Sequence, residues 1–293
     1  MFPIIPASSA TAGGNEGIFG FGSGPASMTN LVSNAGVVAS DTAGVGTARY
    51  DLAACEYGGD KGIFGYGDPA GAVVSVTNLV SDVGVVATDT TGVGTARSGL
   101  AACGYGDDKG IFGFGQTTNL TNLISNAGVV ASDTAGVGTS RYYPGACEYG
   151  GDKGIFGYGA VGGVQSMTNL VSNAGVVASD TAGVGTARSW LMACGYGEDK
   201  GIFGFGTTGG PTKVSMTNLV SNVGVVASDT AGVGTARQAL AACEYDDDKG
   251  IFGFGNDGSA CDITNLVSNA GVVASDVTGV GTARLGLAAC SFG

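Results

Sequence analysis

The sequence contains no histidine among its 293 residues. Histidine is the most common general base at neutral pH and the most common metal ligand in proteins. Lysine and arginine together number only 12 against 24 acidic residues, which gives a net charge of -12. A surface of that charge repels the phosphates of nucleic acids and of anionic membranes. We therefore expect no nucleic-acid partner, no membrane partner, and no cofactor or metal site.

The sequence also lacks long apolar runs. It has no stretch of about 18 apolar residues, which is the length needed to span a bilayer. Residues 1–13 contain no lysine or arginine and only a very short apolar stretch, so they make a poor signal peptide. Proline is scarce at 6 residues, whereas glycine reaches 57 without a Gly-X-Y period. With 44% apolar residues the chain is too apolar to be disordered. The composition fits one large all-β domain.

Cysteine usage gives no disulfide framework. The chain has 7 cysteines, six of which recur at one equivalent position in successive repeats, and Cys261 is the additional one. The six recurring cysteines are Cys55, Cys103, Cys147, Cys194, Cys243 and Cys290. Free cysteine packs as a small buried apolar residue, so we predict free thiols and a reducing compartment or a virion as the location.

The dominant feature is an internal repeat. The string GIFG followed by Phe or Tyr and Gly begins at Gly17, Gly62, Gly110, Gly154, Gly201 and Gly250, at spacings of 44 to 49 residues. Each copy is followed by a TNL segment, then by GVGT and an arginine one residue later, then by a segment that ends in cysteine. The length variation lies in the loop after the GIFG string. Such periods are typical of propellers and solenoids.

Each repeat divides into four short strands separated by turn signals. In the second repeat we expect strand A at 52–57, strand B at 62–66, strand C at 77–81 and strand D at 85–89. Four antiparallel strands per repeat of this length are the signature of a propeller blade. The sequence therefore predicts an all-β fold, a six-bladed β-propeller.

The ends of the chain predict how the ring closes. Residues 287–293 form a strand A with no strands B to D after them, and the first repeat has strands B to D without a strand A. The C-terminal strand should complete the first blade, so that residues 14–293 make one domain without free sheet edges. Residues 1–13 remain outside it as an apolar arm. We expect this arm to dock on its own constant face or channel, or on a neighbouring subunit in a self-assembled structure.

The order of an arginine, a small apolar strand A and a strand B that ends in aromatic-Gly resembles the kelch repeat. The arginines that close the repeats are Arg49, Arg97, Arg141, Arg188, Arg237 and Arg284. The kelch double glycine becomes Gly-aromatic-Gly here, and Val-Val-Ala-Ser stands in place of the kelch tryptophan. The chain also resembles the highly repetitive propellers encoded by some viruses and phages. Both resemblances imply the propeller fold.

One face of the predicted ring carries the differences between repeats. The B–C loops and the two residues after each arginine should share a face, because successive antiparallel strands alternate in direction. The candidate ligand-binding residues on this variable face are Tyr50, Asp51, Tyr142, Tyr143, Trp190, Lys213 and Gln238. Exposed aromatic residues anchor interfaces and stack on sugars. Drift in unconstrained loops, with the aromatics packed on Pro144, is the alternative interpretation.

Two further sets of residues recur around the ring. Each repeat arginine either lines the channel mouth as part of a cationic ring or pairs with a repeat aspartate, and we favour the pairing because buried arginine prefers a fixed carboxylate. The aspartates are Asp41, Asp89, Asp133, Asp180, Asp229 and Asp276. Glu56, Glu148 and Glu244 alternate with Gly104, Gly195 and Ser291. This alternation predicts a three-fold carboxylate pattern in the channel, to which we assign no chemistry.

No constellation of unique polar residues points to catalysis. We therefore expect a non-enzymatic recognition module that binds a glycan or a protein through the variable face. The alternative is a structural component of an assembly, such as a virion or an appendage decoration.

Overall fold

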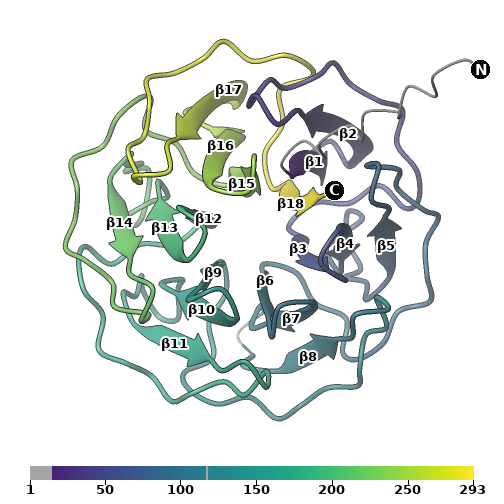
Figure 1. Cartoon of the computed structure of the whole chain (residues 1–293), viewed down its shortest axis with the longest axis horizontal. Coiled ribbons are helices and arrows are strands. Elements are labelled where there is room, and N and C mark those ends of the chain that lie inside the picture. Colours follow the sequence, from purple (N-terminus) through teal and green to yellow (C-terminus); the bar gives the residue numbers. More distant parts are fainter. Residues whose placement is uncertain (1–14, 117) are drawn as a thin grey trace, which may run out of the picture.

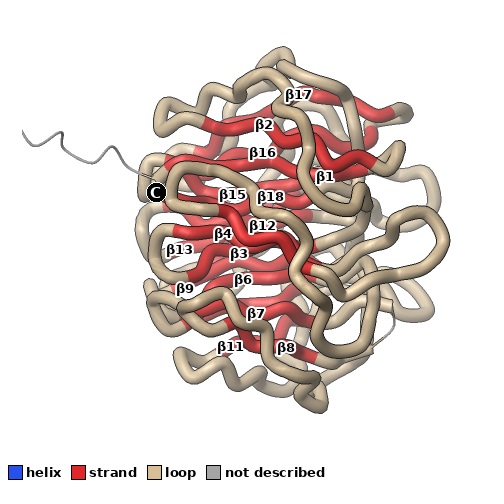
Figure 2. The backbone as a smooth tube through the Cα atoms, turned by 90° about the vertical axis from the view of Figure 1, so that its right-hand side faces the viewer, coloured by secondary structure: helices blue, strands red, loops and turns tan. Residues whose placement is uncertain are grey.

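The computed structural model describes residues 15–116 and 118–293 of the chain. These residues form an all-β repeat protein of six three-stranded antiparallel sheets. The sheets are arranged around a central axis (Figure 1), and their strands run between two faces that carry the loops (Figure 2). The arm predicted at residues 1–13 lies outside the described residues.

Each sheet has an inner strand near the axis, a middle strand and an outer strand. The inner strands are β3 (Ala53–Tyr57), β6 (Ala101–Tyr105), β9 (Gly145–Tyr149), β12 (Met192–Tyr196), β15 (Ala241–Tyr245) and β18 (Ala288–Phe292). The middle strands are β1 (Glu16–Gly22), β4 (Lys61–Gly65), β7 (Lys109–Gly113), β10 (Lys153–Gly157), β13 (Lys200–Gly204) and β16 (Lys249–Asn256). The outer strands are β2 (Ala26–Val32), β5 (Thr77–Val80), β8 (Thr121–Ile124), β11 (Thr168–Val171), β14 (Thr217–Val220) and β17 (Ala260–Val267).

The two ends of the described chain share one sheet, with strand order β18-β1-β2. Strand β18 is antiparallel to β1, and Ile18 lies opposite Cys290 while Phe19 lies opposite Ala289. The prediction that the last strand completes the first repeat is confirmed. The inner strands also contact one another in sequence, from β3 through β6, β9, β12 and β15 to β18, and β18 in turn contacts β3.

The predicted fourth strand is not present, and each sheet has three strands. In the second repeat the outer segment forms only isolated β-bridges with β5, at Val80–Val86 and Thr77–Thr90. The outer segment has one more residue between these bridges than β5 does, so no continuous ladder forms. The Asn78 side chain fills the gap, donating from Nδ2 to the Ala87 carbonyl at 3.0 Å and to Asp89 Oδ1 at 2.9 Å.

The core lies between neighbouring sheets, where large residues pack over glycines. A Cβ added to Gly20 would lie 2.7 Å from the Phe64 ring of the next sheet. A Cβ added to Gly17 would likewise lie 2.7 Å from the Cys243 sulfur. The repeat cysteines therefore fill small volumes between sheets, as predicted, and all seven cysteines are buried and free. This packing explains why glycine recurs inside the middle strands.

The repeat arginines join adjacent sheets. Arg49 lies 4.2 Å above the Phe21 ring of the first sheet, and its Nε donates to the Tyr66 carbonyl of the second sheet at 2.7 Å. Its Nη2 donates to Asn78 Oδ1 at 2.7 Å. All six arginines are at most 1% exposed, so they form no cationic ring at a channel mouth. Burial lowers the pKa of Arg49 to about 10.

The predicted arginine–aspartate pairs are present in five repeats. Within residues 15–116 and 118–293, five arginines lie 3.7–4.0 Å from the expected carboxylate, for example Arg49 and Asp89 at 4.0 Å. The aspartate has closer partners, because Thr47 donates its backbone N–H to Asp89 Oδ2 at 3.0 Å. Each aspartate thus fastens the connector from the preceding sheet. None of the described residues form a helix of the length and apolarity needed to cross a bilayer.

Candidate functional site

The variable loops and the junctions after the arginines lie together on one face. Isolated bridges join the first junction residue to the start of the neighbouring loop, as in Tyr50–Asp68 and Gln238–Asn256. We call this surface the variable face. The opposite surface, which carries the turns between inner and middle strands, is called the constant face. The loops and junctions that differ between repeats therefore lie side by side on the variable face.

The second junction residues form a closed circuit of hydrogen bonds. They are Asp51, Gly99, Tyr143, Trp190, Ala239 and Gly286. Each backbone N–H donates to the carbonyl of the preceding member at 2.7–3.2 Å, and Asp51 donates to Gly286. All six have φ between 54° and 64°. That region favours glycine, so aspartate, tyrosine, tryptophan and alanine are held there at a cost in backbone strain.

Three of the sequence-predicted residues belong to this circuit, and a fourth, Tyr142, contacts one of them. The Tyr143 and Trp190 rings are stacked, with centroids 3.3 Å apart and an interplanar angle of 18°. Tyr142 approaches Tyr143 edge-on at 5.2 Å. The Tyr143 hydroxyl donates to Asp51 Oδ2 at 3.0 Å, across Gly99, where a Cβ would lie 2.8 Å from the tyrosine ring. We call Asp51, Tyr142, Tyr143 and Trp190 the aromatic cap.

The cap has an ionisable acceptor beside its rings. Burial raises the pKa of Asp51 to about 6, although the hydrogen bond from Tyr143 opposes this shift. Burial also raises the pKa of the Tyr143 hydroxyl above its usual range. At neutral pH the pair is therefore a neutral phenol that donates to a carboxylate. All four residues of the cap are half-buried, so part of each side chain reaches solvent.

Pro144, on which the alternative interpretation packs the aromatics, lies close to Tyr143 and Trp190 because all three line one cavity. Pro144 lines the cavity under the cap together with leucines from the other repeats, namely Leu52, Leu100, Leu191, Leu240 and Leu287. The remaining three candidates lie on the flanking loops and junctions. Tyr50 bridges to Asp68, Lys213 bridges to Thr207, and Gln238 bridges to Asn256. The Oε1 atom of Gln238 is buried and accepts no hydrogen bond.

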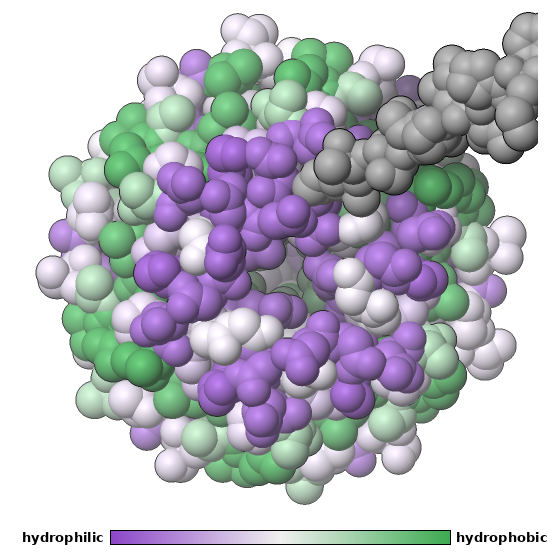
Figure 3. Space-filling model, in the orientation of Figure 1, coloured by the Kyte–Doolittle hydropathy of each residue, from purple (hydrophilic) through white to green (hydrophobic). Residues whose placement is uncertain are grey.

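Beneath the cap, cavities continue along the axis towards the constant face. The cavity under the cap and the next one share Leu52, Leu100 and Met192, and the remaining lining of the second cavity is alanine. The third cavity shares alanines with the second and adds the repeat cysteines and three glutamates. The space-filling view shows a hollow at the centre of the constant face, surrounded by hydrophilic residues (Figure 3). These cavities make up an axial channel.

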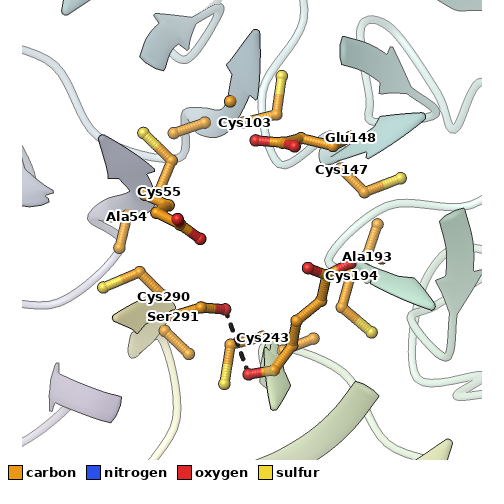
Figure 4. A pocket seen from close by; sticks show the side chains of 17 residues that line it. Ala54, Cys55, Cys103, Cys147, Glu148, Ala193, Cys194, Cys243, Cys290 and Ser291 are labelled. Atoms are coloured by element: carbon orange, nitrogen blue, oxygen red, sulfur yellow. Dashed lines mark hydrogen bonds between the residues drawn. The ribbon is translucent and has the colours of Figure 1, made fainter. Parts of the chain in front are cut away.

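The predicted carboxylate pattern lies in this channel. Glu148 borders it, whereas the sulfur atoms of Cys103, Cys147 and Cys290 point away from the axis (Figure 4). The alternation of glutamate with glycine in successive repeats has a packing cause that could not be predicted from the sequence. The Glu148 carboxylate occupies the space where a Cβ on Gly104 would be, and Glu244 does the same over Gly195.

The surroundings of the three glutamates disfavour the ionised form. Burial, followed by the charges of Asp60 and Asp247, raises the pKa of Glu56 to about 7. Burial and the charge of Glu56 raise the pKa of Glu148 to about 8. Burial and the charges of the other two glutamates raise the pKa of Glu244 well above its usual range. At neutral pH the surroundings therefore favour the protonated form of Glu148 and Glu244.

The described ranges contain no group of three or more histidine, cysteine or carboxylate residues placed to hold a metal ion. No protein-family model matches the chain, and no curated protein matches it either.

Proposed function

We propose that the six sheets form a closed six-bladed β-propeller of the kelch-like type. The cyclic contacts of the inner strands support this, as does the strand order β18-β1-β2. The circuit of six backbone hydrogen bonds at one mouth also supports it, because each bond joins neighbouring repeats. In this proposal each blade has three strands and a bridged outer segment in place of the fourth.

We propose further that the protein is a non-enzymatic recognition module that binds a glycan or a protein through its variable face. The aromatic cap carries this proposal. At six equivalent positions three repeats hold glycine or alanine and three hold Asp51, Tyr143 and Trp190, and Tyr143 contacts both of the others. Drift would scatter such residues, whereas Tyr143 and Asp51 are 92 residues apart and share a hydrogen bond. Aromatic rings beside a carboxylate suit a ligand with apolar faces and hydroxyl or amide donors.

The test measures binding to a glycan array, together with pull-downs, for the wild type and for Trp190→Ala and Tyr143→Ala. Both variants should lose at least about tenfold in affinity, which is the loss of roughly 1.4 kcal/mol expected at an anchor residue. Asn126→Ala, an exposed change on the constant face, is the matched control and should bind as the wild type does. Equal binding by the wild type and both cap variants would count against the variable face.

The second candidate is a structural component of an assembly, such as a virion or appendage decoration. Exposed valines on the turns that follow the outer strands, 62–65% exposed in all six repeats, favour it because apolar surface marks contacts. Light scattering and electron microscopy of the purified protein separate the candidates. A persistent monomer would argue against an assembly component.

A further inference from the structure

Exposed valines recur along the rim of the molecule on the constant-face side. The turn valines that are 62–65% exposed are Val37, Val85, Val129, Val176, Val225 and Val272. From the residue before the turn glycine to the repeat arginine, the six repeats differ only by exchanges among alanine, valine, serine and threonine. The turns between inner and middle strands, by contrast, exchange glycine for aspartate and glutamate. The rim therefore has apolar side chains in every repeat, although turns exposed to water do not need them.

A groove lies between the fifth and sixth repeats at this rim. It is lined by Leu219 and Val233 of the fifth repeat and by Val272 of the sixth. The boundary between the sixth and first repeats has the same local packing. A Cβ on Gly36 would lie 2.9 Å from Leu266, as a Cβ on Gly271 would lie 2.9 Å from Leu219. The residues that correspond there are Ala35, Val37, Leu266, Val277 and Val280, none of them charged.

The arm has the chemistry of an occupant for such a groove. Residues 1–13 contain no charged side chain, and Phe-Pro-Ile-Ile stands at 2–5. Proline at positions 3 and 6 favours an extended path that needs no hydrogen bonds from a partner strand. Burying this segment in an uncharged groove removes apolar surface from water without burying a charge.

The described chain begins close to the groove between the sixth and first repeats. The Asn15 carbonyl accepts a hydrogen bond from Asp246 at 2.6 Å, and the Asn15 N–H donates to Asp247 at 2.9 Å. The neighbouring Tyr245 ring forms one wall of this boundary, since a Cβ on Gly36 would lie 2.9 Å from its Cζ. Ten residues of extended chain reach up to about 33 Å, well beyond the length of a tyrosine side chain.

Tethering also selects among the possible docking places. Attachment to the same chain through a short linker gives an effective concentration in the millimolar range, which favours a groove of the same chain over that of a second copy. The channel mouth on the same face is surrounded by hydrophilic residues (Figure 3), which suits an apolar segment less well. We propose that residues 2–5 dock in the groove between the sixth and first repeats of their own chain, which leaves the variable face free.

Photo-crosslinking of the full-length protein tests this proposal. Replacing Phe2 with p-benzoylphenylalanine keeps an apolar aromatic group at the position, and mass spectrometry locates the crosslink. The expected product is a monomer crosslinked within 35–38 or 264–280. A crosslinked dimer would place the arm on a second copy, and a crosslink elsewhere, or none, would also overturn the proposal.

A pair of matched variants sharpens the result. Val37 and Val129 are 63% and 65% exposed at equivalent turns, so Val37→Asp and Val129→Asp disturb the fold equally little. Val37→Asp should remove at least about 80% of the crosslink and lower Tm to that of the protein lacking residues 1–13, whereas Val129→Asp should change neither. Equal crosslinking in the two variants would show that this groove is not the docking site.

Discussion

At the scale of single residues, the asparagine of the TNL segment connects a buried arginine to the outer segment of its own repeat. It is completely buried in every repeat, at Asn30, Asn78, Asn122, Asn169, Asn218 and Asn265. In the third repeat its Oδ1 accepts from Arg97 at 2.7 Å, and its Nδ2 donates to the Ala131 carbonyl at 3.0 Å. A neutral amide thus satisfies a buried guanidinium and holds the outer segment where a strand ladder is missing.

Removing this amide should be costly. Asn122→Ala leaves a buried Arg97 donor and the Ala131 carbonyl without partners, so we expect the free energy of unfolding to fall by about 2–4 kcal/mol. Asn126→Ala is the control, because Asn126 is exposed and should change stability by no more than about 0.5 kcal/mol. Denaturant titration measures both. Similar losses in the two variants would contradict the role of the buried amide.

The cysteines allow a second prediction at this scale. All seven are buried and free, and burial raises the pKa of thiols such as Cys55. Native protein should therefore react slowly with a thiol reagent, because the thiolate is the reactive form. After denaturation without reductant, titration should reach seven thiols per chain, the full cysteine content. Fewer than six would reveal disulfides.

At the scale of elements, β18 protects the edge of β1. Its residues Ala288, Cys290 and Phe292 are at most 3% exposed, and Phe292 lies opposite Glu16. Without β18 the middle strand β1 would present unpaired backbone groups and an uncovered Phe19, which is a template for association with other chains. The first sheet thus depends on a strand more than 250 residues away from it in sequence.

Truncation after residue 286 tests the importance of β18. We expect the unfolding free energy to fall by at least about 3 kcal/mol, since burial of one phenylalanine alone contributes about 1.5–3 kcal/mol, and we expect self-association. Size-exclusion chromatography and thermal denaturation report both effects. A synthetic peptide of residues 285–293 should restore Tm in proportion to its concentration. A truncated protein that stays monomeric and keeps the Tm of the full-length protein would refute the role of β18 in completing the first sheet.

At the scale of the whole molecule, alternate repeats place three glutamates in one channel. Their pKa values are higher in the folded protein than in the unfolded chain, so the folded protein binds more protons between about pH 4.5 and pH 8. The free energy of unfolding must then fall as pH rises through this range. Each unit of upward pKa shift costs about 1.4 kcal/mol once the group is ionised.

Glu148→Gln separates this effect from other causes. The variant should be more stable than the wild type at pH 8 and about equal to it at pH 4.5, because the amide cannot ionise. Glu198→Gln, an exposed change in a turn of the constant face, should leave the pH profile unchanged. Urea denaturation across this pH range measures the slopes. A Glu148→Gln profile parallel to that of the wild type would show that the pKa of Glu148 is not raised in the folded protein.

Much of the fold follows from the sequence alone, because the repeat places strong local signals at a constant spacing. Glycine, asparagine and aspartate mark the turns, and the GIFG string marks the middle strand. Since 287–293 repeats the inner strand, its place beside β1 could also be predicted, as could the small-volume packing of the cysteines. The candidate residues of the variable face were found where the repeats differ.

The tertiary structure decided what depends on contacts between distant residues. The outer segment has strand-like residues, yet the Asn78 side chain and one extra residue prevent a ladder. Which variable residues meet was decided by the backbone circuit, which turns Tyr143 across Gly99 to Asp51. The pairing of glutamate with glycine around the channel is equally non-local, because each carboxylate needs space that the neighbouring repeat leaves open.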